Sequence, residues 1–132
     1  MAGKILLEVV TPEKLLLSQQ VDEVIAPGSE GEFGVLPGHG HLLSTLHIGE
    51  LRYRVGDLTN HMAVLWGYAE VTPTKVTIMA EIAEKAEDID IERATAKVAE
   101  AERRLQVGGL PSEVKEAEIS LEKARLRKKI AE

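Results

Sequence analysis

The chain contains no cysteine, and among its 132 residues only one Trp, two Tyr and one Phe are aromatic. Without cysteine, a disulfide, a thiolate nucleophile and a cysteine-ligated metal are all excluded, which is compatible with a reducing compartment. Ligand pockets are usually lined by apolar and aromatic side chains, so the shortage of aromatic residues weakens the case for a small enzyme.

Long hydrophobic runs are also missing. No stretch approaches the roughly 20 apolar residues that a membrane-spanning helix needs. Residues 1–10 lack the charged head, the apolar stretch and the cleavage site of a signal peptide. We therefore expect any membrane role to be exerted only through partners.

The net charge of −6 is unevenly distributed. Residues 1–84 contain eleven acidic and five basic residues, whereas the rest of the chain contains eleven of each. An acidic body argues against a nucleic-acid partner, because nucleic acids bind basic surfaces. The basic residues at 123–129 fit the dipole at a helix end as well as they fit a bound phosphate or an acidic partner surface.

The sequence changes character near Lys85. Before this point, short β-rich runs alternate with Gly and Pro turns, and residues 49–55 show the period-two pattern of a half-buried strand. Nine or ten such runs at close spacing predict an antiparallel sandwich or flattened barrel over residues 1–84. Residues 61–66 and 68–71 read as separate runs, kinked at Gly67.

Residues 85–132 predict an antiparallel α-helical hairpin. Asp88 is a natural N-cap for a first helix, residues 108–111 stop it, and Ser112 can cap a second. Apolar residues recur at helical spacing on one face of each helix. On the first helix they are Ile91, Ala94, Val98, Ala101 and Leu105, and on the second Val114, Ala117, Leu121 and Ala124.

These two stripes are rich in alanine. Because alanine buries little apolar area, each contact contributes less than the ~1.5–3 kcal/mol of a buried Leu or Ile. An isolated hairpin of this size is marginally stable. We therefore expect the hairpin to be stabilised by contact with the β domain or with a partner, and to rearrange at a small cost in free energy.

No residue pattern points to a catalytic centre or a metal site. Two histidines spaced as His39 and His41 share a face of a strand, but the carboxylate expected about four residues further on is missing, since residues 44–46 are Ser, Thr and Leu. Loop or surface histidines are therefore favoured over a metal site that also includes His47. Neither G-x-S-x-G nor a phosphate-binding G-x-x-x-x-G-K-[ST] occurs.

A polar group does stand out in the hairpin. Asp90 and Arg93 lie on the first turn of the first helix, and folding the hairpin about Gly109 places Arg93 opposite residue 125 or 126. Lys123 and Arg127 would then cluster at the same open end. Three cations and a carboxylate can hold an anionic ligand, although from the residues alone a solvated set of weak ion pairs is favoured.

Several segments, in order, resemble one family along essentially the whole chain. Residues 30–39 read EGEFGVLPGH, residues 67–73 have the pattern G-x-x-E-V-x-P, residues 76–80 read VTIMA, and residues 86–90 read AEDID before Arg93 and Ala94. These segments resemble the epsilon subunits of bacterial F-type ATP synthases. The resemblance implies a sandwich of about ten strands followed by a C-terminal helical hairpin. It also implies a non-catalytic subunit of the central stalk that needs no cofactor.

The resemblance also implies partners. In this family the sandwich binds the gamma subunit and rests on the ring of c subunits, so that it helps to couple proton flow to ATP synthesis. Glu32 and His39 match positions on the side that meets the c ring. The hairpin lies folded or extends into the catalytic head of alpha and beta subunits, where it inhibits ATP hydrolysis. The implied location is peripheral, at the cytoplasmic face of the bacterial plasma membrane.

Some members of the family bind ATP in the folded hairpin through the motif I/L-D-x-x-R-A. Residues 89–94 satisfy it with Asp90, Arg93 and Ala94, while Glu84 and Arg127 match further contacts. Lys123 stands where those members have Arg, which keeps the charge but loses the fork geometry. Glu100 also stands where they have Arg, a reversal of charge that bears on affinity. The resemblance thus implies ATP as a regulatory ligand.

Two other functions are compatible with the layout. One is a stand-alone adaptor or chaperone-like module that uses the hairpin as a client arm, and the other is a small metalloenzyme using His39, His41 and His47. The ordered motifs favour the coupling subunit over both. Co-purification with a gamma subunit tests the adaptor, and metal analysis tests the metalloenzyme.

Overall fold

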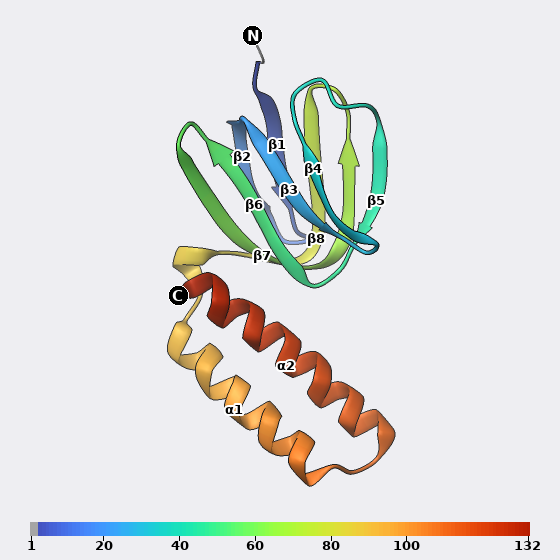
Figure 1. Cartoon of the computed structure of the whole chain (residues 1–132), viewed down its shortest axis with the longest axis vertical. Coiled ribbons are helices and arrows are strands. Elements are labelled where there is room, and N and C mark those ends of the chain that lie inside the picture. The colour runs from blue at the N-terminus through green and yellow to red at the C-terminus, as the bar shows by residue number, and fades with distance from the viewer. Residues whose placement is uncertain (1–2) are drawn as a thin grey trace. The chain divides into compact units, whose positions relative to one another are not determined.

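The computed structural model describes residues 3–132 and divides the chain, between Lys85 and Ala86, into two compact units. The first unit is built from strands and the second from helices (Figure 1). This is the predicted class, a β-sandwich followed by a helical hairpin.

The described part of the first unit forms eight strands. They are β1 Ile5–Val10, β2 Leu15–Val21, β3 Glu23–Gly28, β4 Gly31–Val35, β5 Leu42–Leu46, β6 Gly49–Val55, β7 Leu58–Val71 and β8 Lys75–Lys85. The strands are hydrogen-bonded in the order β2-β1-β8-β7-β5-β3-β4, and β6 pairs with both β3 and β7.

The count is lower than the nine or ten expected because two predicted runs form one strand. β7 continues through Gly67, where two separate runs were expected, and β8 continues to Lys85. The first half of β7 pairs with β6 and the second half with β5. One long strand therefore serves both layers of the sandwich.

The strand bends at Trp66 and Gly67, which have φ angles of 56° and 142°. The register of β7 against β8 is the same before and after the bend, since Leu65 pairs with Ile82 and Gly67 with Ala80. The bend therefore does not shift the pairing of the two strands. A Cβ atom on residue 67 would lie 2.0 Å from the Met79 carbonyl oxygen. Glycine is therefore required both for the backbone conformation and for the close approach of β8.

One pairing contradicts the expected antiparallel sheet. β1 and β8 run parallel, from Leu6 opposite Lys75 to Val10 opposite Met79, while the other paired strands are antiparallel. A parallel pair needs a long crossover, and here nearly the whole domain forms it.

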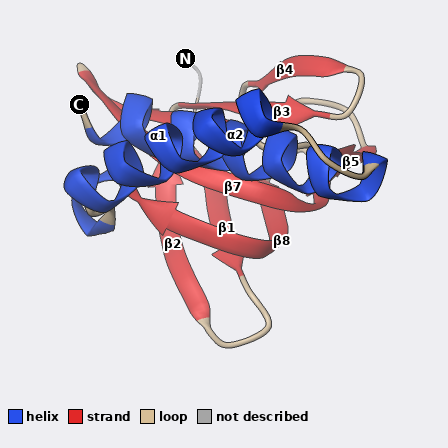
Figure 2. Cartoon of the chain, turned by 90° about the horizontal axis from the view of Figure 1, so that it is seen from below, coloured by secondary structure: helices blue, strands red, loops and turns tan. Residues whose placement is uncertain are grey.

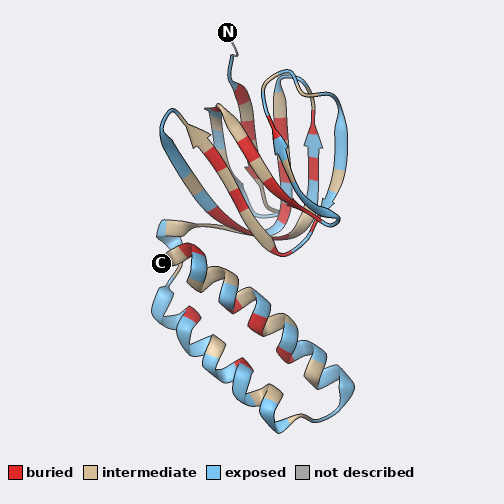
Figure 3. Cartoon of the chain, viewed as in Figure 1, coloured by how far each residue is buried: buried red, intermediate tan, exposed pale blue. Residues whose placement is uncertain are grey.

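The core lies between the two layers, and in strands such as β1, β6 and β8 buried residues alternate with more exposed ones, as the burial colours of Figure 3 show. β1 shows the pattern clearly, since Ile5, Leu7 and Val9 are fully buried and the residues between them are half-buried. The other buried core residues are Val21, Val24, Ala26, Val35, Leu46, Leu51, Tyr53, Met62, Val64, Ala69, Val71, Val76, Ile78 and Ala80.

The second unit contains a short 3₁₀ helix, η1 Ala86–Asp88, and the helices α1 Ile91–Val107 and α2 Pro111–Ala131 (Figure 2). The expected cap at Asp88 is wrong, because Asp88 lies in η1 and the Asp90 carboxylate accepts a hydrogen bond from the Arg93 amide at 3.1 Å. The expected cap at Ser112 is also wrong. Proline suits the first turn of a helix, so α2 already begins at Pro111.

The predicted inner faces of the helices are largely confirmed. Ala94 and Ala101 of α1 are buried, as are Ala117, Leu121 and Ala124 of α2. Ile91 is the exception, since its side chain is exposed. Small side chains allow the helices to approach closely but bury little area, so the interface gains little free energy from apolar burial.

Within residues 3–132, no helix has the length and apolar character needed to cross a membrane.

Replacing Gly67 by alanine should destabilise the sandwich by about 2–4 kcal/mol, because the new Cβ would meet the β8 backbone and the φ angle is unfavourable. The single tryptophan, Trp66, lies beside the substitution and reports unfolding of this unit by fluorescence in urea. Gly34→Ala is the matched control, since the nearest atom to its Cβ is 4.0 Å away. Equal losses in the two variants would contradict the proposed constraint.

Candidate functional site

An apolar row crosses the outer face of the layer formed by β1, β8, β7 and β5. The strand register places Val10 beside Met79, Met79 beside Tyr68, and Tyr68 beside Thr45. Residues paired in this way point to the same face, which is opposite the face that buries Ala69. Tyr68 is 54% exposed and Met79 40% exposed, so two large apolar side chains stand side by side in solvent.

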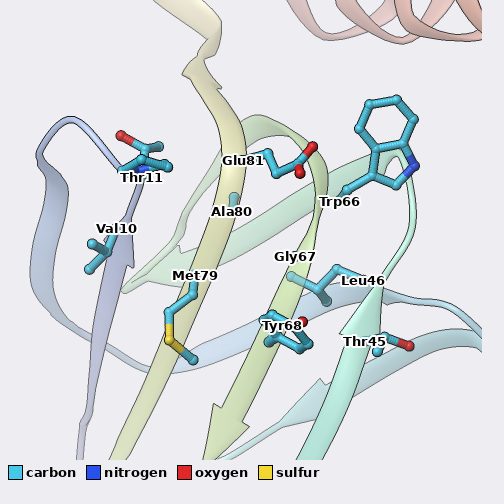
Figure 4. Close-up of a pocket in the computed structure, with 11 residues that line it drawn as sticks. Val10, Thr11, Thr45, Leu46, Trp66, Gly67, Tyr68, Met79, Ala80 and Glu81 are labelled. Carbon is cyan, nitrogen blue, oxygen red and sulfur yellow. The ribbon is translucent and has the colours of Figure 1, made fainter.

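The apolar row borders a depression of about 590 Å³. Figure 4 shows Tyr68 and Met79 together on neighbouring strands, with Leu46 and Trp66 nearby. The next row across the sheet is more polar, with Glu8 beside Thr77 and Thr77 beside Glu70. An exposed apolar surface with a polar border is typical of a protein interface.

A charged cluster lies on β4, β6 and β7. The Arg52 guanidinium donates to both Glu32 carboxylate oxygens, at 3.1 and 3.2 Å, and to Glu50 Oε1 at 2.9 Å. His61 Nδ1 lies 3.2 Å from the other Glu50 oxygen. The hydrogen bonds from Arg52 to Glu32 and then to Glu50 raise the pKa of Arg52 above its ordinary value.

The two predicted c-ring residues are not neighbours. Glu32 is the second residue of β4, next to the turn from β3, whereas His39 lies in the loop after the far end of β4. His39 Nδ1 is 2.7 Å from the Gly40 carbonyl oxygen. Three residues of β4, about 10 Å of strand, separate Glu32 from the end of that strand, and His39 follows in the loop beyond it.

A charged groove of about 220 Å³ lies between the two helices of the hairpin. It brings together Lys123 and Arg127 from α2, as their spacing predicted, with Lys97, Glu100 and Arg104 from α1. Lys97 and Arg104 were missed, although their seven-residue spacing places them on one helix face. Four cations and one carboxylate therefore line the groove, an excess of positive charge that attracts anions, and Arg104 Nη2 also lies 3.8 Å from Glu116 Oε1.

The other predicted nucleotide-binding residues do not line this groove. Asp90 caps α1, Ala94 is buried between the helices, and Glu84 belongs to β8 in the first unit. The expected position of Arg93 opposite residue 125 is wrong. Arg125 Nη2 lies 3.3 Å from Glu102 Oε2, more than two helical turns along α1 from Arg93.

No group of three or more His, Asp or Glu residues is placed to hold a metal ion in the part of the chain that the structure describes. His39, His41 and His47 in particular do not form such a group. The geometry therefore gives the metalloenzyme hypothesis no support.

Residues 4–86 match the model of the β-sandwich domain of the ATP synthase delta/epsilon chain, and residues 87–132 match the model of its long α-helix domain. The chain belongs to the ATP synthase delta/epsilon family. The resemblance seen in the sequence motifs is thus confirmed over both units.

Curated members of the family are similar over their full length. The ATP synthase epsilon chain of Syntrophobacter fumaroxidans is 53% identical over 132 residues, which are 100% of this chain and 98% of that protein. The epsilon chain of Citrifermentans bemidjiense is 49% identical, over 99% of this chain and 96% of that protein.

Solved structures agree with the fold. A chain of the mitochondrial ATP synthase of Euglena gracilis, solved with OSCP, F1 and the c ring, aligns with a TM-score of 0.83 and 26% identity. The alignment covers 95% of this chain and 79% of that one. A chain from the central stalk and c ring of the Tetrahymena thermophila enzyme aligns with a TM-score of 0.68 at 14% identity, over 99% of this chain and 98% of that one, and supports the fold alone.

Proposed function

We propose that the chain is the epsilon subunit of an F-type ATP synthase, a non-catalytic part of the central stalk that couples proton-driven rotation to ATP synthesis. The observation that carries this proposal is the match, at 53% identity along the entire sequence, to the epsilon chain of Syntrophobacter fumaroxidans. The subunit requires no cofactor. It works at the cytoplasmic face of the bacterial plasma membrane, which it meets only through its partners.

The apolar row and its depression form the surface proposed to hold the gamma subunit. Stable interfaces have an apolar centre and a polar rim, and the exposed Tyr68 and Met79 beside the more polar Glu8–Thr77–Glu70 row provide both. The c ring is the proposed partner of Glu32, on the charged cluster, and of His39 at the other end of β4. These assignments give the gamma subunit the more extensive apolar contact.

The hairpin is proposed to regulate the enzyme. In its extended state it would contact the alpha and beta subunits of the catalytic head and inhibit ATP hydrolysis. The alanine-rich interface supports this role, because helices that bury little area can exchange one set of contacts for another at little cost.

ATP is the proposed regulatory ligand of the folded hairpin. Lys97, Arg104, Lys123 and Arg127 would hold its phosphates in the groove, whose volume of about 220 Å³ is below the roughly 300–1,000 Å³ of sites that enclose a whole ligand. Glu84, Asp90, Arg93 and Ala94 are proposed as further contacts on the family motif alone, since they do not line the groove. A ligand that binds one state preferentially shifts the population toward it.

Replacing Tyr68 and Met79 together by lysine should weaken binding to a catalytic head that contains gamma but lacks this subunit by about tenfold or more. Two charges would replace apolar contacts worth ~1.5–3 kcal/mol each when buried. Titration calorimetry measures the affinity. Leu58→Lys is the control, since Leu58 is 72% exposed and lies at the start of β7, away from the apolar row. An unchanged affinity for the double variant would place gamma elsewhere.

Removal of the hairpin should raise ATP hydrolysis by the reconstituted head several-fold. The full chain is compared with a version ending before Asp88, and both are added until the head is saturated. Equal hydrolysis at equal occupancy would exclude the inhibitory role. Failure of the full chain to bind the head at all would favour the adaptor hypothesis.

Millimolar ATP should shift the NMR signals of the hairpin in the full-length chain and raise its melting temperature. Arg127→Gln should weaken this binding about tenfold, since hydrogen bonds to charged groups contribute roughly 1.5–3 kcal/mol. Arg103→Gln is the control, because Arg103 is exposed on α1 and does not line the groove. Glu100→Arg should strengthen binding by removing the carboxylate. If ATP changes neither the NMR signals nor the melting temperature, the hairpin does not bind it.

A further inference from the structure

The ion pair between Arg52 and Glu32 crosses a strand. Glu32 lies on β4 and Arg52 on β6, and β3 runs between them, paired with both. Two parallel hydrogen bonds, at 3.1 and 3.2 Å, join the two side chains. A bidentate pair of this kind fixes the plane of the carboxylate as well as its position.

Side-chain exposure rises from Glu50 through Arg52 to Glu32. The Glu50 side chain is 11% exposed, that of Arg52 27% and that of Glu32 53%. Arg52 also donates a hydrogen bond to the less exposed Glu50, which in turn contacts His61 on β7. Arg52 is therefore anchored on the sheet, and Glu32 is the most exposed member of the cluster, ahead of His61 at 42%.

We infer that Arg52 is a positioning residue, which orients the Glu32 carboxylate for contact with the partner that the proposed function assigns to it, the c ring. A free glutamate side chain loses rotamer entropy when it is immobilised. Because Arg52 already holds the Glu32 side chain in one orientation, this entropy is not lost again when the partner binds. This inference rests on the proposed function and adds a residue that does not itself touch the partner.

The same geometry indicates the chemistry of the partner surface. A carboxylate offers about four lone-pair positions, and Arg52 occupies one on each Glu32 oxygen. Each Glu32 oxygen has a further lone-pair position that can accept from an N–H donor of a second molecule. We therefore expect the c ring to present a hydrogen-bond donor, amide or cationic, rather than an apolar side chain at this point.

A double-mutant cycle tests the inference. Heads carrying gamma and each full-length variant are bound to immobilised c rings in detergent, and the dissociation constants are compared. Glu32→Gln and Arg52→Gln should each weaken binding by about threefold to fivefold. The double variant should be no weaker than Glu32→Gln alone. Arg52→Lys should recover only part of the affinity, because lysine keeps the charge but not the fork.

Arg54→Gln provides the matched control. Arg54 lies two residues along the same strand, and it pairs with Asp22 and Glu23 instead of Glu32. It should leave c-ring affinity unchanged while removing the same charge. If it weakens binding as much as Arg52→Gln, the effect is one of net charge or stability and the positioning role is wrong.

Other outcomes separate this inference from the proposed function. If Glu32→Gln weakens binding but Arg52→Gln does not, the proposed c-ring contact of Glu32 is supported and the positioning role of Arg52 is wrong. Additive losses would mean that Arg52 contacts the partner directly, which also overturns it. If Glu32→Gln has no effect, the proposed contact at Glu32 is itself wrong, whereas the gamma contact at Tyr68 and Met79 is tested independently.

Discussion

The bend of β7 at Trp66 and Gly67 is the constraint on which both surfaces of the sandwich depend. β7 and β8 can approach there only because residue 67 has no side chain to meet the Met79 carbonyl. Before the bend, β7 lies beside β6 and holds His61 opposite Arg52. After it, β7 lies beside β5 and holds Tyr68 opposite Thr45. The charged cluster and the apolar row thus belong to different layers because one strand turns between them.

Much of the fold could be predicted from residue patterns alone, because period-two and helical spacing reflect burial directly. The alternation in residues 49–55 marked a strand, and the alanine stripes marked the inner faces of the hairpin. Strand direction could not be predicted in the same way, since β1 has the same pattern whether β8 runs parallel or antiparallel to it. The start of each helix could not be predicted because two nearby residues were equally suitable. Asp88 and Asp90 can each cap the first helix, and Pro111 and Ser112 can each begin the second.

Less of the candidate site was predictable. Lys123 and Arg127 were found because they lie one turn apart on one helix, so their proximity is local. Lys97 and Arg104 join them only through the alignment of α1 with α2, which alanine side chains leave weakly specified in the sequence. The pairing of Arg52 with Glu32 depends on β3 lying between β4 and β6, and no sequence spacing reveals that order. Contacts between distant segments needed the structure.

The parallel pairing of β1 with β8 also bears on how the chain folds during synthesis. The first strand of the sandwich remains without one of its two neighbours until the last strand has left the ribosome. Contacts so distant in sequence make folding slow, because a long loop must close before the pairing is gained. The nascent sandwich therefore exposes the edge of β1 for almost the entire translation of the domain, a period in which an unpaired strand is vulnerable to aggregation.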